Sequence, residues 1–320
     1  MPIIDTHQHI WMEPPGAMWE RYTPDQMMAD MAHSGHNIIG TVYIDSRAHY
    51  SELGPEHLRC VGETAFAEQV AQESLRRGGR EAGACAAIAT YADLMMGHAV
   101  GEVFDAHMAA SPRFRGIRYM TAMDQDLSSD HWWAPQGIMK DPVFLDGFSE
   151  LASRDLMFDA WIYHPQIPDL VELARRFPDT TIILDHLGGP LLIGRYSGRE
   201  EESFVEWRKN MAALAECPNV SVKLGGVNSS TTGWSARDLP LPPSSEKTAE
   251  IQRRHMFTAI DLFGPRRCMF ESNFPVDMVS ISFTVLWNAF KRMTADFSDA
   301  DRRDLFAGTA SRVYRIPIAG

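Results

Sequence analysis

The stretch IIDTHQHIW, residues 3–11, places two histidines one residue apart inside an apolar run. Apolar residues on both sides predict a short buried strand. Side chains alternate between the two faces of a strand, so His7 and His9 point the same way, roughly 6–7 Å apart along the chain. Two imidazoles on one face can share a metal ion. They can also be two ordinary histidines, and this stretch alone does not separate the two readings.

Seven further strand-like runs follow, and segments with helical periodicity separate them. TPDQMMADMAHSG (23–35), for example, has Thr23 as a candidate N-cap and Gly35 as a stop signal. Strands that alternate with helices indicate parallel pairing, and eight such units predict an α/β fold, a (β/α)8 barrel formed by residues 1–320 as a single domain. The eight predicted strands begin at Pro2, Asn37, Ala84, Phe114, Met157, Thr180, Val220 and Arg267.

Long irregular segments follow four of the predicted strands. They comprise residues 45–56, 119–140, 188–200 and 227–245, whereas the segments that lead into strands are shorter. Loops that follow strands lie at the C-terminal mouth of a barrel, where barrel enzymes have their active sites. We therefore expect the functional residues at that mouth.

Composition excludes several classes of function. With 30 basic and 42 acidic residues the formal net charge of the 320-residue chain is -12, which argues against a nucleic-acid partner. The four cysteines are widely spaced, as expected for reduced thiols in a cytoplasmic protein. No window approaches the ~20 apolar residues of a membrane span. We expect a small-molecule substrate and no membrane partner, and a homo-oligomer is left open.

Reactive side chains gather at the predicted strand ends. Four of the twelve histidines lie there: His7, His9, His164 and His186. Such a cluster suits a divalent ion such as Zn²⁺, which binds imidazole nitrogen and activates water. The other reactive residues at strand ends are Arg118, Tyr163, Lys223, Glu271 and Asn273.

Five motifs follow one another along the chain: DTHQHIW (5–11), YHPQ (163–166), LDHLGGP (184–190), KLGG (223–226) and SNFPVD (272–277). Together they resemble the amidohydrolase superfamily, and more narrowly its lactonase branch, which includes sugar lactonases and 2-pyrone-4,6-dicarboxylate lactonase. The resemblance covers essentially the whole chain, from Asp5 to the region of Arg312 and Tyr314. HxH alone is common, whereas its combination with LDHLGGP and SNFP is specific.

The resemblance implies hydrolysis of a lactone or related cyclic ester of a sugar acid or an aromatic-catabolite fragment, by water attack at the barrel mouth. It implies that histidines of this set bind a metal or polarise the carbonyl. We expect His7, His9 and His164 to bind at most one divalent ion, zinc or manganese, and a metal-free site is the alternative.

One position departs from the family pattern. The family has an aspartate at the end of the last strand, where this chain has Asn273, and an amide cannot act as a base near neutral pH. We expect His186 to be the general base and Asn273 to orient the water, so that Asn273→Asp keeps or raises activity. Glu271 is the second candidate base if burial raises its pKa. A structural acid paired with Lys223 is the alternative for Glu271.

Three residues are predicted to bind the substrate. Arg118 offers a bidentate site for a carboxylate, and a salt bridge between strand and helix is the alternative. Tyr163 follows the fifth predicted strand. Trp133, with His131 and Trp132, lies in the long fourth loop and can cover a substrate ring or pack on the rim of the barrel.

Two other functions fit the same motifs. A metal-dependent decarboxylase of an aromatic or unsaturated carboxylic acid shares HxH and two later histidines, and it also has the aspartate of the last strand. A non-catalytic binding protein could keep the fold without the base. LDHLGGP and YHPQ favour the lactonase.

Overall fold

A computed structural model describes residues 1–13, 20–128, 133–228, 232–234 and 241–318. Eight parallel strands form one sheet in the order β1 to β8, each hydrogen-bonded to the next along the chain. All eight predicted strands are confirmed, although several are shorter than predicted. Their bounds are β1 (Ile3–Gln8), β2 (Ile38–Ile44), β3 (Ala87–Thr90), β4 (Phe114–Met120), β5 (Met157–Trp161), β6 (Ile182–Leu184), β7 (Val220–Leu224) and β8 (Cys268–Phe270).

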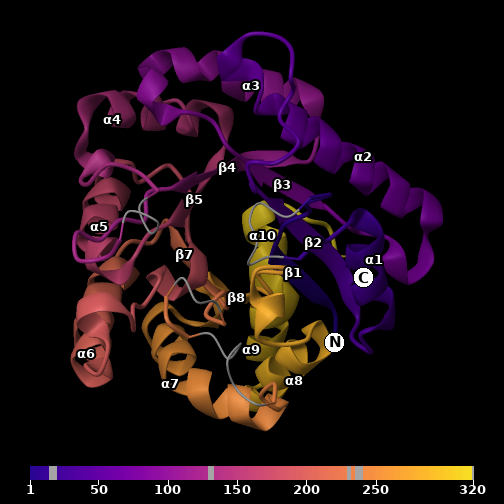
Figure 1. The fold of residues 1–320 in the computed structure, drawn as a ribbon, viewed down its shortest axis with the longest axis vertical. Coiled ribbons are helices and arrows are strands. Elements are labelled where there is room, and N and C mark those ends of the chain that lie inside the picture. The colour runs from indigo at the N-terminus through magenta and orange to yellow at the C-terminus, as the bar shows by residue number, and fades with distance from the viewer. Residues whose placement is uncertain (14–19, 129–132, 229–231, 235–240, 319–320) are drawn as a thin grey trace.

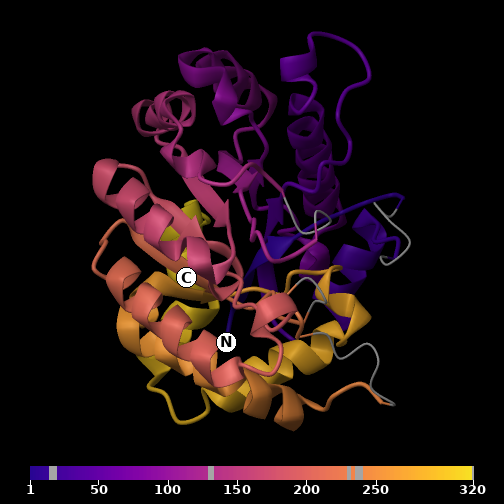
Figure 2. The ribbon, with the colours of Figure 1, turned by 60° about the vertical axis from the view of Figure 1, so that its left-hand side comes forward.

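Helices follow the strands and lie around them, as Figures 1 and 2 show. This arrangement of helices around a parallel sheet is the predicted (β/α)8 barrel. The α-helices are α1 (Pro24–His33), α2 (Val61–Arg77), α3 (Gly101–Ala110), α4 (Pro142–Ser149), α5 (Ile167–Arg176), α6 (Glu200–Ala215), α7 (Ser245–Phe263), α8 (Phe283–Met293), α9 (Asp299–Arg303) and α10 (Thr309–Tyr314).

Local signals explain where helices begin and break. Thr23 caps α1, and its side chain accepts a hydrogen bond from the backbone of Gln26. The helical segment that follows β3 is divided into a 3-10 helix (Leu94–Val100) and α3. The division coincides with Gly97, whose φ of 58° lies in the left-handed region and cannot continue a right-handed helix.

The first and last strands meet and close the barrel. Gln8 forms an isolated parallel bridge with Phe274, and the Asn273 backbone N–H donates to the carbonyl oxygen of His7 at 3.0 Å. The Thr6 hydroxyl donates to the carbonyl of Phe270 at 3.0 Å. This closure places His7 in β1, and His9 just after it, beside the residues that follow β8, although about 260 residues separate them in the sequence.

The last helices close the opposite end of the barrel. Tyr314 is fully buried, its hydroxyl donates to Asp159 at 2.7 Å, and its backbone carbonyl accepts from Arg115. Its neighbours are apolar residues near the starts of the strands. We call this cluster the barrel floor; it includes Ile4, Val42, Ala87, Met157, Ile183, Met269, Ala307, Ala310, Tyr314 and Ile316. The floor leaves the C-terminal mouth as the open end of the barrel.

Within the described ranges, none of the helices combines the length and the apolarity that a bilayer crossing requires.

Candidate active site

A cavity of about 340 Å³ lies where several strands end. Its walls come from residues that follow different strands, which puts it at the predicted mouth of the barrel. The lining side chains used below are His9, Asp45, Arg118, Trp161, His186 and Asn273.

His7 and His9 face each other as their spacing in the strand predicts. Their Nε2 atoms are 3.2 Å apart, and both side chains are almost completely buried. His9 Nδ1 lies 3.0 Å from the carbonyl oxygen of Ile44, which only accepts, so Nδ1 carries the proton and Nε2 keeps its lone pair. Burial lowers the pKa of both imidazoles. The positive charge of Lys223 lowers the pKa of His7 further. Both are therefore neutral near pH 7, which is the form that binds metal.

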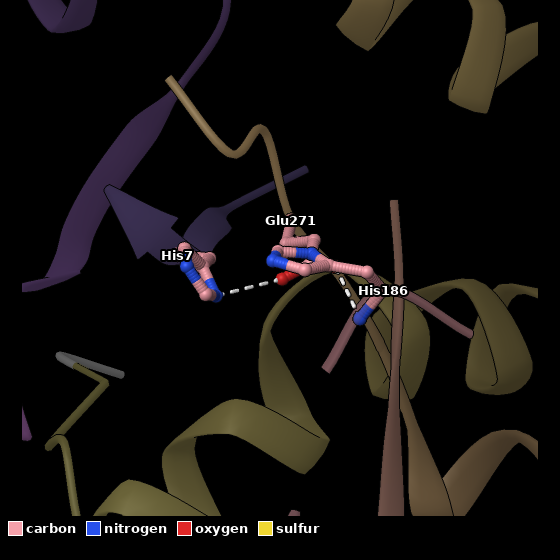
Figure 3. A group of neighbouring side chains, drawn as sticks. All are labelled: His7, His186 and Glu271. Carbon is pink, nitrogen blue, oxygen red and sulfur yellow. Dashed lines mark hydrogen bonds and ion pairs between the residues drawn. The ribbon is translucent and has the colours of Figure 1, made fainter. Parts of the chain in front are cut away.

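Glu271 lies between two histidines, as Figure 3 shows. One carboxylate oxygen accepts from His186 Nδ1 at 2.7 Å and from the His186 backbone N–H at 3.1 Å. The other oxygen is 3.1 Å from His7 Nδ1. Burial alone would raise the pKa of Glu271, but the charges and hydrogen bonds of His186 and His7 outweigh it and lower the pKa to about 2. The carboxylate is therefore ionised; one oxygen accepts from His186, and the other lies close to the His7 ring.

Both predicted readings of Glu271 need correction. A base requires a raised pKa, whereas the pKa of Glu271 is lowered. The alternative partner, Lys223, instead pairs with Asp159 at 2.5 Å and with Asp185 at 3.0 Å. Glu271 is better described as the carboxylate that fixes the orientation and tautomer of His186 and lies beside the His7 ring.

His186 occupies a backbone conformation that few residues adopt. Its φ is 52°, in the left-handed region, and the next residue, Leu187, has a φ of 56°. Such conformations concentrate at functional sites. A Cβ on the neighbouring Gly226 would come within 1.8 Å of His186 Nδ1, so a glycine is needed there. Because Nδ1 donates to Glu271, the Nε2 lone pair of His186 remains available, and its ring lines the cavity.

A buried lysine supports this cluster from below. Lys223 Nζ lies 3.2 Å from His7 Nδ1 and bonds to Asp159 and Asp185, and all four side chains are fully buried. Burial alone would lower the pKa of Lys223, but the two aspartates, with Glu271, raise it. The ammonium group therefore stays charged and balances the buried carboxylates.

Asn273 donates its side-chain amide to a buried carboxylate that sequence analysis did not single out. Its Nδ2 is 2.9 Å from Asp277 Oδ1, and Asp277 also accepts from the backbone and side chain of Asn228. Burial raises the pKa of Asp277 to about 6, and the hydrogen bonds from Asn228 and Asn273 oppose that rise. The amide carbonyl of Asn273 is therefore held in one orientation. The signal was within SNFPVD, whose last residue is Asp277.

Two predicted site residues lie elsewhere. His164 does not line the cavity; its Nδ1 accepts from the Leu191 backbone N–H at 3.2 Å, and its ring packs on Tyr196 with centroids 4.9 Å apart. The structure therefore does not bring His164 to His7 and His9, as the predicted metal set requires. Tyr163 is fully buried against Trp161 and does not line the cavity either.

The other predicted substrate contacts do line the cavity. Arg118 is almost fully buried there, and its Nε lies 3.6 Å from Asp185 Oδ2, a longer contact than a hydrogen bond. Trp133 lines the cavity while remaining partly exposed. His131 and Trp132 lie outside the described residues. Sequence analysis missed Asp45 and Trp161 as lining residues, since neither belongs to a recognised motif.

The donor set fits a divalent cation. His9 Nε2 keeps its lone pair and faces His7 Nε2 across 3.2 Å, while His7 Nδ1 lies near Lys223, Glu271 and Asp185. Two imidazole nitrogens on one tetrahedral zinc ion, each at ~2.0–2.1 Å, lie about 3.3 Å apart. Within the described part of the chain, His7, His186 and Glu271 also form a group whose ligand atoms all lie within 4.8 Å of one another.

Comparison with known proteins gives a consistent picture. Residues 4–316 match the family model described as Amidohydrolase. A protein of Sinorhizobium fredii named uncharacterized protein y4mH is 32% identical over 336 residues, covering 98% of each chain. An L-fucono-1,5-lactonase of Burkholderia ambifaria is 29% identical over 327 residues, covering 98% of this chain and 95% of the relative. A crystal structure of an amidohydrolase from Burkholderia multivorans with bound zinc superimposes with a TM-score of 0.75 at 25% identity, covering 99% of this chain and 100% of that chain.

Proposed function

This chain belongs to the amidohydrolase family of hydrolases, and we propose that it is a lactonase that opens the ring ester of a sugar acid or a similar hydroxy acid. The observation that carries the proposal is the meeting of His9, His186 and Asn273 at one cavity, with His7 directly behind them. The likeness to L-fucono-1,5-lactonases supports a lactone rather than another ester or an amide. It also favours hydrolysis over decarboxylation or binding alone.

In the proposed reaction His186 acts as general base. Its Nε2 takes a proton from water as the water oxygen bonds to the lactone carbonyl carbon. The bond between that carbon and the ring oxygen then breaks, and the ring oxygen takes the proton back from the imidazolium. Glu271, bonded to His186 Nδ1, stabilises the imidazolium while it exists, as a buried carboxylate does in other catalytic histidine pairs. The products are one hydroxyl group and one carboxylate.

Two cavity residues are proposed to position the reactants. Asn273, whose amide is fixed by Asp277, orients the attacking water or the carbonyl with its side-chain oxygen. Arg118 offers a guanidinium group to a carboxylate, either one carried by the substrate or the one formed on ring opening. Trp133 covers part of the ring from the fourth loop.

A divalent ion, zinc or manganese, is proposed as the cofactor. His7 would hold it, with His9 on its Nε2 side or with His186 and Glu271 on its Nδ1 side. When bound, the ion would supply a Lewis acid that polarises the ester carbonyl. Elemental analysis of the purified protein is expected to find at most one equivalent, and two equivalents retained after dialysis would contradict the proposal. Loss of the metal in His9→Ala but not in His186→Asn would assign the ion to the Nε2 side.

The function is tested with a panel of five- and six-membered lactones and a pH indicator that follows acid release. We expect turnover of at least one hydroxylated lactone above the spontaneous rate, and no release of carbon dioxide from aromatic carboxylic acids. Decarboxylation without lactone hydrolysis would replace the proposal with the decarboxylase. Absence of both reactions in protein of verified metal content would support a binding protein.

A further inference from the structure

Two buried carboxyl groups, those of Asp45 and Glu63, lie beside the cavity, and the proposed reaction does not use them. Asp45 directly follows β2, is fully buried and lines the cavity. Glu63 belongs to α2 and is also fully buried. Burying two carboxyl groups together is unfavourable unless each is hydrogen-bonded or protonated. Their location at the wall of the cavity therefore calls for a functional reason.

Glu63 is hydrogen-bonded to the residues on both sides of Asp45, at positions 43 and 46. Its Oε1 accepts three hydrogen bonds, from the Tyr43 hydroxyl at 2.7 Å and from the Ser46 backbone and hydroxyl, both at 2.9 Å. No donor among the described residues reaches its Oε2. Burial first, and then the charge of Asp45 and a hydrogen bond to it, raise the pKa of Glu63 well above its ordinary value. The shift favours the protonated form of Glu63, which can donate to Asp45, while its two bonds to Ser46 fix the residue next to Asp45.

Asp45 has weak contacts on its other side. Its Oδ1 accepts from the Arg47 backbone N–H at 3.2 Å, and the Tyr50 hydroxyl is at 3.5 Å, the limit of a hydrogen bond. A carboxylate can accept about four hydrogen bonds, so Asp45 retains acceptor capacity at the cavity. The Arg47 side chain lines the same cavity and supplies donors beside this acceptor.

We propose that Asp45, held by Glu63, is a specificity-determining residue that accepts a hydrogen bond from a ring hydroxyl of the substrate. The inference rests on the proposed lactonase function and narrows the substrate class to a lactone with hydroxyl groups on its ring. A hydroxyl both donates and accepts, so one hydroxyl or a neighbouring pair satisfies Asp45 and Arg47 together. A ring carboxylate at this position would be repelled by Asp45.

The indole rings of the cavity fit the same substrate class. Trp11 and Trp161 contribute to its walls, and both are almost fully buried. Large rigid aromatic side chains cover the apolar faces of a ligand ring while polar groups at its edge set the orientation. In this cavity Asp45 and Arg47 would form hydrogen bonds with the hydroxyl groups at the edge of the ring.

The test compares two six-membered lactones that carry the same ester. Glucono-1,5-lactone has ring hydroxyls, and δ-valerolactone has none. The measured quantity is the ratio of their kcat/KM values after subtraction of spontaneous hydrolysis. We expect the wild-type protein to favour the hydroxylated lactone at least tenfold, and Asp45→Asn, which keeps the shape and removes the charge, to lower the ratio about 10- to 100-fold, as expected for a hydrogen bond to a charged group.

Variants of Glu63 test its role as a positioning residue. In Glu63→Gln the amide carbonyl can accept from Tyr43 and Ser46 while the amide N–H donates to Asp45, so this variant should retain much more of the selectivity ratio than Glu63→Leu. Equal loss in both variants would contradict the positioning role. Asp126→Asn, at an exposed carboxylate that bonds to Arg195 outside the cavity, is the matched control and should leave the ratio unchanged.

Three outcomes would overturn the inference. If Asp45→Asn lowers kcat/KM for both lactones by the same factor, Asp45 has only a structural role. A wild-type protein that hydrolyses lactones without preferring the hydroxylated one would refute the inference and leave the lactonase proposal intact. If the wild-type protein hydrolyses no lactone on the wider panel, both proposals fail together. Melting temperatures of all variants establish that each one is folded.

Discussion

Glu271 and Glu63 are both completely buried at the walls of one barrel, yet their pKa values move in opposite directions. Burial raises the pKa of each, but His186 and His7 outweigh it at Glu271, whereas the charge of Asp45 adds to it at Glu63. Glu271 therefore favours its ionised form, and Glu63 favours its protonated form. The neighbours of a buried carboxyl group decide its charge, and its charge decides whether it can orient imidazoles or donate to a carboxylate.

The largest expected effect comes from removing the buried ammonium group of Lys223. Lys223→Met leaves Asp159 and Asp185 buried without their charge partner. Breaking a buried ion pair in this way costs about 3–5 kcal/mol. We expect a loss of that size in the free energy of unfolding, measured by urea denaturation.

The control for this prediction is an exposed lysine. Lys247 pairs with Glu250 at the surface, where an ion pair contributes about 1 kcal/mol or less. Lys247→Met should therefore change the free energy of unfolding little. Equal effects of the two substitutions would show that the buried charges are not coupled as the distances indicate.

The next largest effect is expected on kcat, from a substitution at His186. His186→Asn removes the proposed base together with the imidazolium that Glu271 would stabilise. Loss of a general base lowers the rate by about 10²–10⁴-fold, so kcat for a lactone should fall at least about a hundredfold while the protein stays folded. A decrease of less than tenfold in initial-rate measurements would remove His186 from this role.

An intermediate effect is expected from a carboxylate introduced at Asn273. Sequence alone predicts that Asn273→Asp keeps or raises activity, but the Asn273 amide donates to the buried Asp277 at 2.9 Å. Two carboxyl groups at that distance must share a proton or repel each other. We now expect the substitution to destabilise the protein by about 1–3 kcal/mol at pH 8.

The destabilisation should be smaller at pH 5. The pKa of Asp277 is already raised to about 6, so a proton is available to the pair at the lower pH. Thermal unfolding at both pH values measures the difference. Equal melting temperatures of wild type and Asn273→Asp at pH 8 would contradict this prediction.

The most gradual effect concerns the buried carboxyl group of Glu63. Unfolded Glu63 ionises near its ordinary pKa of 4.5, and folded Glu63 keeps its proton to higher pH. Between these two values the folded state binds more protons, so the free energy of unfolding falls as pH rises, by at most about 1.4 kcal/mol per pH unit from this group.

Glu63→Gln removes this dependence because an amide does not ionise in the range. The difference in free energy of unfolding between wild type and Glu63→Gln should therefore shift in favour of the variant as pH rises above 4.5. Denaturation at intervals from pH 4 to 8 measures it. A difference that is constant over this range would show that Glu63 ionises normally in the folded protein.

Sequence was sufficient for the barrel and for three of the four predicted histidines. The alternation of apolar strands with helices specifies parallel pairing, and the two-residue spacing of His7 and His9 at the end of β1 places both on one face. Parallel strands end at one edge of the sheet, which accounts for the positions of His186 and Asn273 at the same mouth.

His164 shows where this reasoning fails. Strand β5 ends at Trp161, and the chain then turns into a 3-10 helix (His164–Gln166), so alternation no longer predicts the direction of the side chain. Asp45 and Glu63 were missed for another reason. They approach each other only after α2 packs on the barrel, and no spacing in the sequence encodes that contact. The partners of Glu271 likewise depend on how β6 and β8 end in three dimensions.

The barrel floor has a consequence for the order of events during synthesis. β1 is translated about 260 residues before β8, and the floor that includes Tyr314 is translated later still. At ~5–20 residues per second this interval lasts roughly 13–50 s. Throughout it, the edge of β1 that later pairs with the segment after β8 has no partner from its own chain. Unpaired strand edges promote pairing between chains, so the newly made protein is most prone to aggregate just before its final residues emerge.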